Sequence, residues 1–108
     1  MSDQQLRIYR IEAGHLEEFA DAWTRGVEPL RRRFGFRSQA WTVPAEGVFI
    51  WLVAYDGEGT FEAADAAYYA SSERKALAPD PARWIEANET RSLVPLSGGR
   101  SSVGGSAP

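Results

Sequence analysis

The stretch VFIWLVAY, residues 48–55, decides the fold because each of its side chains is apolar or aromatic. It is short and rich in β-branched and aromatic residues, which predicts a strand. Both alternating faces are apolar, so this strand should lie inside a sheet that is covered on both sides. Alternation gathers the following residues on one face: Phe49, Trp51, Val53 and Tyr55.

A second strand is predicted directly before the first. FRSQAWTV, residues 36–43, is also strand-forming, and PAEG at residues 44–47 separates the two segments. Proline and glycine are typical of turns, so the pair should form an antiparallel hairpin. Alternation places one set of its residues on a common face: Arg37, Gln39, Trp41 and Val43.

Upstream of the hairpin, the sequence predicts a strand followed by a helix. QLRIYRIE at residues 5–12 has apolar side chains on both faces, as a central strand does. From residue 16 to residue 34, apolar residues recur at steps of three and four, which predicts one helical stripe. Gly26 and Pro29 interrupt it, so the helix should kink or restart there, and Gly35 should end it.

Downstream of the hairpin, a second helix and a last strand are predicted. Thr60 is a typical N-cap for a helix over residues 61–70, and the charges of Glu73, Arg74 and Lys75 that follow should be solvated. Asp80 and Pro81 predict a short extra helix with Trp84 and Ile85 packed inward, and residues 89–96 predict a strand. Residues 1–96 therefore form one domain, and the Gly/Ser-rich residues 97–108 should be a flexible tail.

This order of elements, βαββαβ, predicts an α+β fold. We expect a four-stranded antiparallel sheet with both helices on one face. The other face would then be bare, although the strands at residues 5–12 and 48–55 have apolar residues on both sides. A second copy of the sheet covers that face most simply, so we expect a homodimer.

The composition limits which kinds of molecule the protein is expected to bind. The net charge is −3, which gives no general attraction for nucleic acid or anionic lipid. No apolar run is long enough to span a bilayer, and the first ten residues lack the apolar region of a secretory signal, so we expect a cytoplasmic protein. The sequence has no cysteine and a single histidine, so we expect neither a metal nor a cofactor.

Four segments together resemble the NIPSNAP family of the dimeric α/β-barrel, ferredoxin-like superfamily: LRIYRIEAGHLEEFADAW, VEPLRRRFGF, FIWLVAYDG and AAYYASSERKAL. The resemblance covers roughly residues 5–96 and implies the fold and a dimer. It implies little chemistry, because NIPSNAP-like proteins have no generally assigned activity. Relatives with the same barrel include cofactor-independent monooxygenases, cyclases, isomerases and haem-degrading enzymes. Several of those use a histidine on a strand, which this chain lacks.

Arg7 and Tyr9 are the predicted polar centre of a site, since they share one face of the strand expected to be central. A buried arginine must be paired, and two interpretations stay open: a structural ion pair with a carboxylate such as Glu89, or an anchor for a ligand. We take Arg7, Tyr9 and Tyr55 as candidate catalytic residues. The candidate substrate-binding residues are Trp23, Arg31, Trp41, Trp51 and Tyr69.

Each aromatic residue of this set could equally be ordinary core. His15 titrates near neutrality, but its place in the first turn of a helix favours an exposed or capping role over general acid-base chemistry.

Two functions follow from these residues. The first is a cofactor-free enzyme that oxygenates, cyclises or isomerises a hydrophobic aromatic or polyketide-like compound of secondary metabolism, between sheet and helices. The alternative is a non-catalytic dimeric sensing or interaction module with a filled core. A cavity of a few hundred Å³ would favour the enzyme, and its absence would favour the module.

Overall fold

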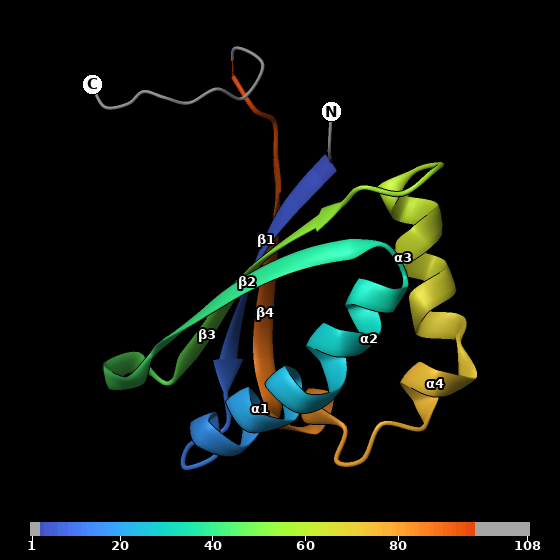
Figure 1. The fold of residues 1–108 in the computed structure, drawn as a ribbon. Helices are drawn as coiled ribbons and strands as arrows, with labels where there is room; N and C mark the ends of the chain where they lie inside the picture. Colours follow the sequence, from blue (N-terminus) through green and yellow to red (C-terminus); the bar gives the residue numbers. More distant parts are fainter. Residues whose placement is uncertain (1–2, 97–108) are drawn as a thin grey trace.

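A computed structural model describes residues 3–96 of the 108-residue chain. The tail predicted for residues 97–108 lies outside the described residues. Four strands form a single sheet: β1 (Asp3–Ile11), β2 (Phe36–Val43), β3 (Val48–Tyr55) and β4 (Ile85–Leu93). Their order is β2-β3-β1-β4 with every neighbouring pair antiparallel, and the helices gather on one side of the sheet (Figure 1). The predicted α+β architecture is therefore confirmed.

The register of the sheet decides which side chains face the helices. Arg7 of β1 lies opposite Trp51 of β3 and opposite Thr90 of β4, and directly paired residues point to the same side. Arg7 and Trp51 are both buried, which places them on the helix-covered face. Leu6 and its partner Leu52 point to the other face, and both are only half-buried.

The first helical segment is continuous but changes its winding. It runs as α1 (Leu16–Ala22), a π-helical turn η1 (Trp23–Val27) and α2 (Glu28–Arg33). In η1, the Glu28 backbone N–H donates to the Trp23 carbonyl five residues earlier. The predicted irregularity at Gly26 and Pro29 is confirmed, since proline has no N–H to continue the ladder and glycine weakens the same turn.

The second helical segment comprises α3 (Phe61–Ala70) and the single turn α4 (Ser72–Lys75). Thr60 caps α3 as predicted, because its side chain accepts a hydrogen bond from the Ala63 N–H. A short 3-10 turn, η3 (Pro81–Trp84), follows, with Trp84 buried.

The predicted start of the last strand was wrong. The strand begins at Ile85, which pairs with Ile11, rather than at residue 89. Pairing with β1 ends the extra helix after one turn, because the Glu12 N–H donates to the Trp84 carbonyl. Sheet pairing thus overrides the local helical pattern of residues 81–87, and the strand ends at Leu93 rather than at residue 96.

The core lies between the sheet and the helices. Its largest fully buried side chains include those of Trp51, Phe19, Phe49, Phe61 and Tyr68, together with one arginine, Arg31. In residues 3–96, none of the helices is both long and apolar enough to cross a membrane.

Candidate functional site

Two buried arginines share one carboxylate beneath the helices. Arg31 Nη1 lies 2.7 Å from Asp65 Oδ1, and Arg7 Nη2 lies 3.3 Å from the same oxygen. Arg31 is 0% exposed and Arg7 is 7% exposed, whereas the Asp65 side chain is 24% exposed. Three elements, β1, α2 and α3, therefore meet at a buried ionic cluster with one positive charge in excess.

Tyr69 joins the same two arginines. Its hydroxyl oxygen accepts hydrogen bonds from Arg7 Nη1 at 3.3 Å and from Arg31 Nη2 at 3.2 Å. Both lone pairs are then occupied, so the hydroxyl hydrogen is left to donate elsewhere. Gln5 lies next to these residues, and its side-chain oxygen accepts hydrogen bonds from Arg7 Nε at 3.0 Å and from Arg7 Nη2 at 2.8 Å. We call Arg7, Arg31, Asp65 and Tyr69 the arginine cluster.

The winding of the first helix places Arg31 in this cluster. Trp23, Val27 and Arg31 are all buried, and the wide turn η1 keeps them on one inward stripe. On α3, Phe61, Asp65 and Tyr68 follow each other at steps of four and three, so they share the inward side of that helix. A carboxylate on this otherwise apolar stripe meets the arginines from the facing elements.

Aromatic rings surround the Arg31 guanidinium on several sides. Its Cζ lies 3.9 Å from the Tyr68 ring centroid and 4.6 Å from that of Phe36. The Trp51 ring is 5.4 Å away. Cation–π attraction offsets part of the desolvation of a charge that is fully removed from water.

Burial and neighbouring charges shift the pKa values of Arg7, Tyr9 and Tyr68. Burial alone would lower the pKa of Arg7, but Asp65 and the neighbouring tyrosines outweigh burial and raise it. Burial, followed by the nearby Tyr69, raises the pKa of Tyr9, against Trp51 and Arg7, which act to lower it. Burial likewise raises the pKa of Tyr68. Tyr9 and Tyr68 are therefore neutral phenols that can donate hydrogen bonds at physiological pH.

A cavity of about 90 Å³ opens beside the arginine cluster. Tyr69 and Ala82 are exposed, which marks where this cavity meets solvent. Its remaining lining is mostly apolar and aromatic, with two arginines: Tyr9, Phe19, Trp23, Val27, Arg31, Trp51, Tyr68, Arg74, Pro81 and Ile85. No carboxylate lines it.

The cavity gathers most of the residues predicted for the site. Five of the eight candidates line it, namely Tyr9, Trp23, Arg31, Trp51 and Tyr69. Arg7 contacts the same group through Tyr69 and through the Trp51 ring, whose centroid lies 5.5 Å from Arg7 Cζ. The structure thus brings together six of the eight candidates and leaves Trp41 and Tyr55 elsewhere.

The predicted placement of Trp41 was wrong. Trp41 pairs with Ile50, whereas Ala40 pairs with Trp51, so Trp41 points away from the helices and is 49% exposed. Alternation alone groups residues within one strand, but the hairpin register decides which group shares a face with Trp51. Arg37 follows Trp41 to the outer face, where it is exposed and bonded to Asp56.

Tyr55 does face the helices, but at the far end of β3. It pairs with Phe36 and lies four residues along the strand from Trp51. Its hydroxyl donates to the Glu58 carbonyl oxygen at 2.6 Å. That hydroxyl therefore closes the loop after β3, and it is not part of the arginine cluster.

Two further expectations concern charged partners. Glu89 is not the partner of Arg7, because it pairs with Ile8 and points to the open face, where it bonds Arg91. His15 occupies the N-cap position of α1, but its half-buried side chain makes no capping hydrogen bond. Its ring stacks on Trp84 at a centroid distance of 5.6 Å, and its Nδ1 lies 2.6 Å from Glu18 Oε1.

Sequence reasoning missed Asp65, Tyr68 and Arg74. The available signal for Asp65 was its position, since it shares the helical stripe of Phe61 and Tyr68, whereas the other carboxylate of the 61–70 segment, Glu62, does not. Arg74 was expected to be solvated, yet its side chain is only 13% exposed because it pairs with Asp80 at 3.2 Å and approaches the Tyr69 ring. The chain folds back after α4, which the local sequence does not indicate.

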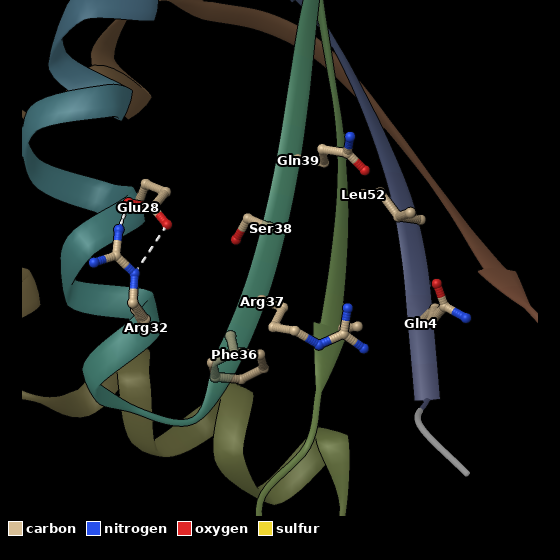
Figure 2. Close-up of a pocket in the computed structure, with 9 residues that line it drawn as sticks. Gln4, Glu28, Arg32, Phe36, Arg37, Ser38, Gln39 and Leu52 are labelled. Atoms are coloured by element: carbon tan, nitrogen blue, oxygen red, sulfur yellow. Dashed lines mark hydrogen bonds and ion pairs between the residues drawn. The ribbon is translucent and has the colours of Figure 1, made fainter.

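Three larger hollows lie away from the predicted residues, and one of these, of about 250 Å³, lies on the open face of the sheet beside Ile8 and Glu89. Another, of about 270 Å³, straddles the edge of β2 (Figure 2), with Glu28 and Arg32 of α2 on one side and Gln39 and Leu52 on the other. The third, of about 720 Å³, lies between α1 and the turn before β3. None of these three is lined by a candidate site residue, so the cavity at the arginine cluster is the candidate site. Across residues 3–96, no three metal-ligating side chains of the His, Cys, Asp or Glu type gather together.

Solved structures with the same fold include NIPSNAP-domain proteins. One from Burkholderia xenovorans superposes with a TM-score of 0.77 at 22% identity, covering 92% of this chain and 99% of that chain. A NIPSNAP family protein from Agrobacterium tumefaciens gives a TM-score of 0.76 at 17% identity, covering 90% and 95%. A provisionally assigned antibiotic biosynthesis monooxygenase from Nitrosomonas europaea gives 0.67 at 16% identity, covering 89% and 91%.

These likenesses confirm the expected NIPSNAP-like, ferredoxin-like fold over nearly the whole described chain. At identities below 25%, they establish the fold and carry no chemistry. No protein-family model matches the sequence, and no curated protein matches it.

Proposed function

We propose that the protein is a cofactor-free enzyme that binds a hydrophobic aromatic or polyketide-like molecule at the cavity beside the arginine cluster. The observation that carries the proposal is the arginine cluster itself, in which two buried arginines share one carboxylate against a wall of tryptophan and tyrosine. Such a wall suits a flat apolar ligand, and the fixed donors suit an oxygen that gains negative charge during reaction.

Each polar side chain then has a definable task. Arg7 and Arg31 hold positive charge at a fixed place, because Asp65 and Tyr69 bind their outer nitrogens. Tyr9, whose raised pKa keeps it protonated, donates to a developing enolate-like oxygen. Trp23 and Trp51 pack against the rings of the ligand and exclude water. Oxygenation, cyclisation and isomerisation all use these features.

Incubation with an anthrone-type tricyclic phenol in air, with a metal chelator present, tests the proposal. Mass spectrometry should detect a product that forms faster with the native protein than with Tyr9→Phe, since that variant loses only a hydroxyl. Binding without turnover would mean that the protein binds aromatic compounds but is not an enzyme. The absence of both binding and turnover across a panel of aromatic compounds would overturn the proposal.

One observation favours the non-catalytic alternative. The cavity measures about 90 Å³, well below the roughly 300–1,000 Å³ of ordinary ligand pockets. As it stands, it accepts only part of a multi-ring compound. A sensing or interaction module with a nearly filled core fits this volume, and it would show no turnover in the same experiment.

Homodimerisation and a cytoplasmic location are parts of the same proposal. The face of the sheet away from the helices carries half-buried or exposed apolar side chains, which a second sheet can cover: Leu6, Ile8, Trp41, Ile50 and Leu52. The proposed dimer buries on the order of 1,200 Å² or more in total.

A further inference from the structure

The cavity at the arginine cluster collects buried polar atoms that lack partners. In the part of the chain that the structure describes, five buried side-chain polar atoms have no hydrogen-bond partner. Four of them belong to residues that line this one cavity: Trp23 Nε1, Trp51 Nε1, Arg31 Nε and the Tyr68 hydroxyl. Trp51 approaches Tyr9, and Arg31 approaches Tyr68, closely enough to act to lower the pKa of each tyrosine, but neither contact has the geometry of a full hydrogen bond. Unpaired buried polar atoms are uncommon and costly, so their concentration at one cavity requires an explanation.

All four atoms can donate a hydrogen bond, and three of them cannot accept one. The tryptophan and arginine N–H groups have no acceptor capacity, and only the tyrosine hydroxyl can act either way. The residues form one contiguous group, with ring centroids of Trp23 and Trp51 5.4 Å apart and Arg31 Cζ 3.9 Å from the Tyr68 ring. A ligand that satisfies them must therefore present acceptors.

The charge of the lining points in the same direction. Arg31 and Arg74 line the cavity, and no carboxylate does, although the chain as a whole has a net charge of −3. Asp65, which does not line the cavity, is occupied by Arg7 and Arg31, and Asp80 pairs with Arg74. The wall is positive and rich in donors at a place removed from water, where a charge-assisted hydrogen bond is strong.

We propose that the cavity selects an aromatic carboxylate, whose ionised group lies among the donors of Trp23, Arg31, Trp51 and Tyr68. This inference rests on the proposed function and names the class of ligand. A single carboxylate suits the small volume, and the attached ring lies toward the mouth at Tyr69 and Ala82. Aromatic side chains and the apolar start of β4 supply contacts for that ring.

Binding of 2-naphthoate and of 2-naphthamide, measured by calorimetry at pH 7, tests this selection. The two probes share a ring system and shape, but only the first is an anion. We expect naphthoate to bind at least roughly tenfold more tightly, because hydrogen bonds to a charged group exceed those to a neutral one. Equal binding of the two probes would overturn the carboxylate inference and leave the proposed function standing.

The variant Tyr68→Phe tests where the carboxylate binds. It should weaken naphthoate binding roughly tenfold and change naphthamide binding less than about twofold. Thermal stability should not fall, because the lost hydroxyl has no partner in the unliganded protein. Ser38→Ala is the matched control, since it removes the remaining unpaired buried hydroxyl, which does not line this cavity, and it should leave both affinities unchanged.

Two other outcomes count against the inference. Naphthoate binding that Tyr68→Phe and Trp23→Phe leave intact would place the anion elsewhere and overturn it. If neither probe binds and no aromatic compound is turned over, both this inference and the proposed function fail. Turnover of a neutral aromatic without naphthoate binding would remove only the inference.

Discussion

The two faces of the sheet are built from alternate residues of the same strands, yet one face buries charged side chains and the other exposes apolar ones. On β1, Arg7 points to the helices and is 7% exposed, whereas its neighbours Leu6 and Ile8 point outward and are only half-buried. On β2, Trp41 on the outer face is 49% exposed. The helix-covered face thus buries cations, while the open face leaves hydrophobic side chains in water.

This difference indicates separate tasks for the two faces. Burying Arg7 and Arg31 costs desolvation that only Asp65, Tyr69 and the aromatic rings offset, which is a poor way to gain stability alone. Exposed apolar side chains on the open face are costly only until another surface covers them. The difference fits the proposal that the helix-covered face binds the ligand and the open face self-associates.

Asp65→Asn should produce the largest effect, because it leaves two buried guanidiniums without a counter-charge. We expect a loss of about 3–5 kcal/mol in the free energy of unfolding, measured by urea denaturation. Asp21→Asn is the matched control, since Asp21 pairs with Arg25 on an exposed helical surface, and it should cost less than about 0.5 kcal/mol. Similar small losses in both variants would mean that the arginine cluster is solvated.

Ile50→Lys tests the open face. Ile50 lies on the outer side of a central strand and pairs with Trp41, so a lysine there would place a charge inside the proposed dimer. We expect at least a hundredfold weaker association, about 2.7 kcal/mol, observed by light scattering as a shift to monomer.

The control for this change lies on the helices. Glu62→Lys makes a new charge on an exposed position of α3 and should leave the dimer intact. A native protein that is monomeric at micromolar concentration would contradict the proposed role of the open face, whatever the variants show.

Arg7→Met separates anchoring from structural pairing. Asp65 keeps Arg31 at 2.7 Å when Arg7 is removed, so we expect stability to fall by no more than about 1–2 kcal/mol. Ligand binding or turnover should be lost. Arg25→Met, in an exposed pair, should change neither property. Lost stability of several kcal/mol with binding retained in the surviving folded protein would identify Arg7 as a structural residue only.

Much of the fold is predictable from sequence because the spacing of apolar residues and the cap and turn residues are signals within a short stretch of chain. The strands at 36–43 and 48–55, the Thr60 cap and the break near Pro29 follow from such signals. The start of β4 does not, since Ile85 is drawn into the sheet by its pairing with Ile11. Long-range pairing overrides the helical signal of Asp80 and Pro81.

The site is predictable in part for the same reason. Alternation places Arg7 and Tyr9 on one face, and helical spacing directs Arg31 inward. The partner of Arg7 is not predictable in this way, because Asp65 lies 58 residues away on a helix whose rotation only the packed structure fixes. Trp41 was misplaced because the register of the hairpin, and not alternation, decides the face.

The smallest predicted effect is a dependence of stability on alkaline pH, which arises from Tyr9 and Tyr68 between the sheet and the helices. Burial raises the pKa of Tyr9 and Tyr68 above the ordinary value of about 10. Below that pH both the folded and unfolded chains are protonated, so the full stability is present. As pH rises from about 10 through the raised pKa values, the unfolded chain releases protons first and stability falls. The slope should not exceed about 1.4 kcal/mol per pH unit for each tyrosine.

Urea denaturation of the native protein and of the double variant Tyr9→Phe, Tyr68→Phe between pH 8 and 11 measures this slope. The two curves should run parallel below pH 10 and diverge above, with the variant flatter, whereas parallel curves throughout would show that both hydroxyls are open to solvent.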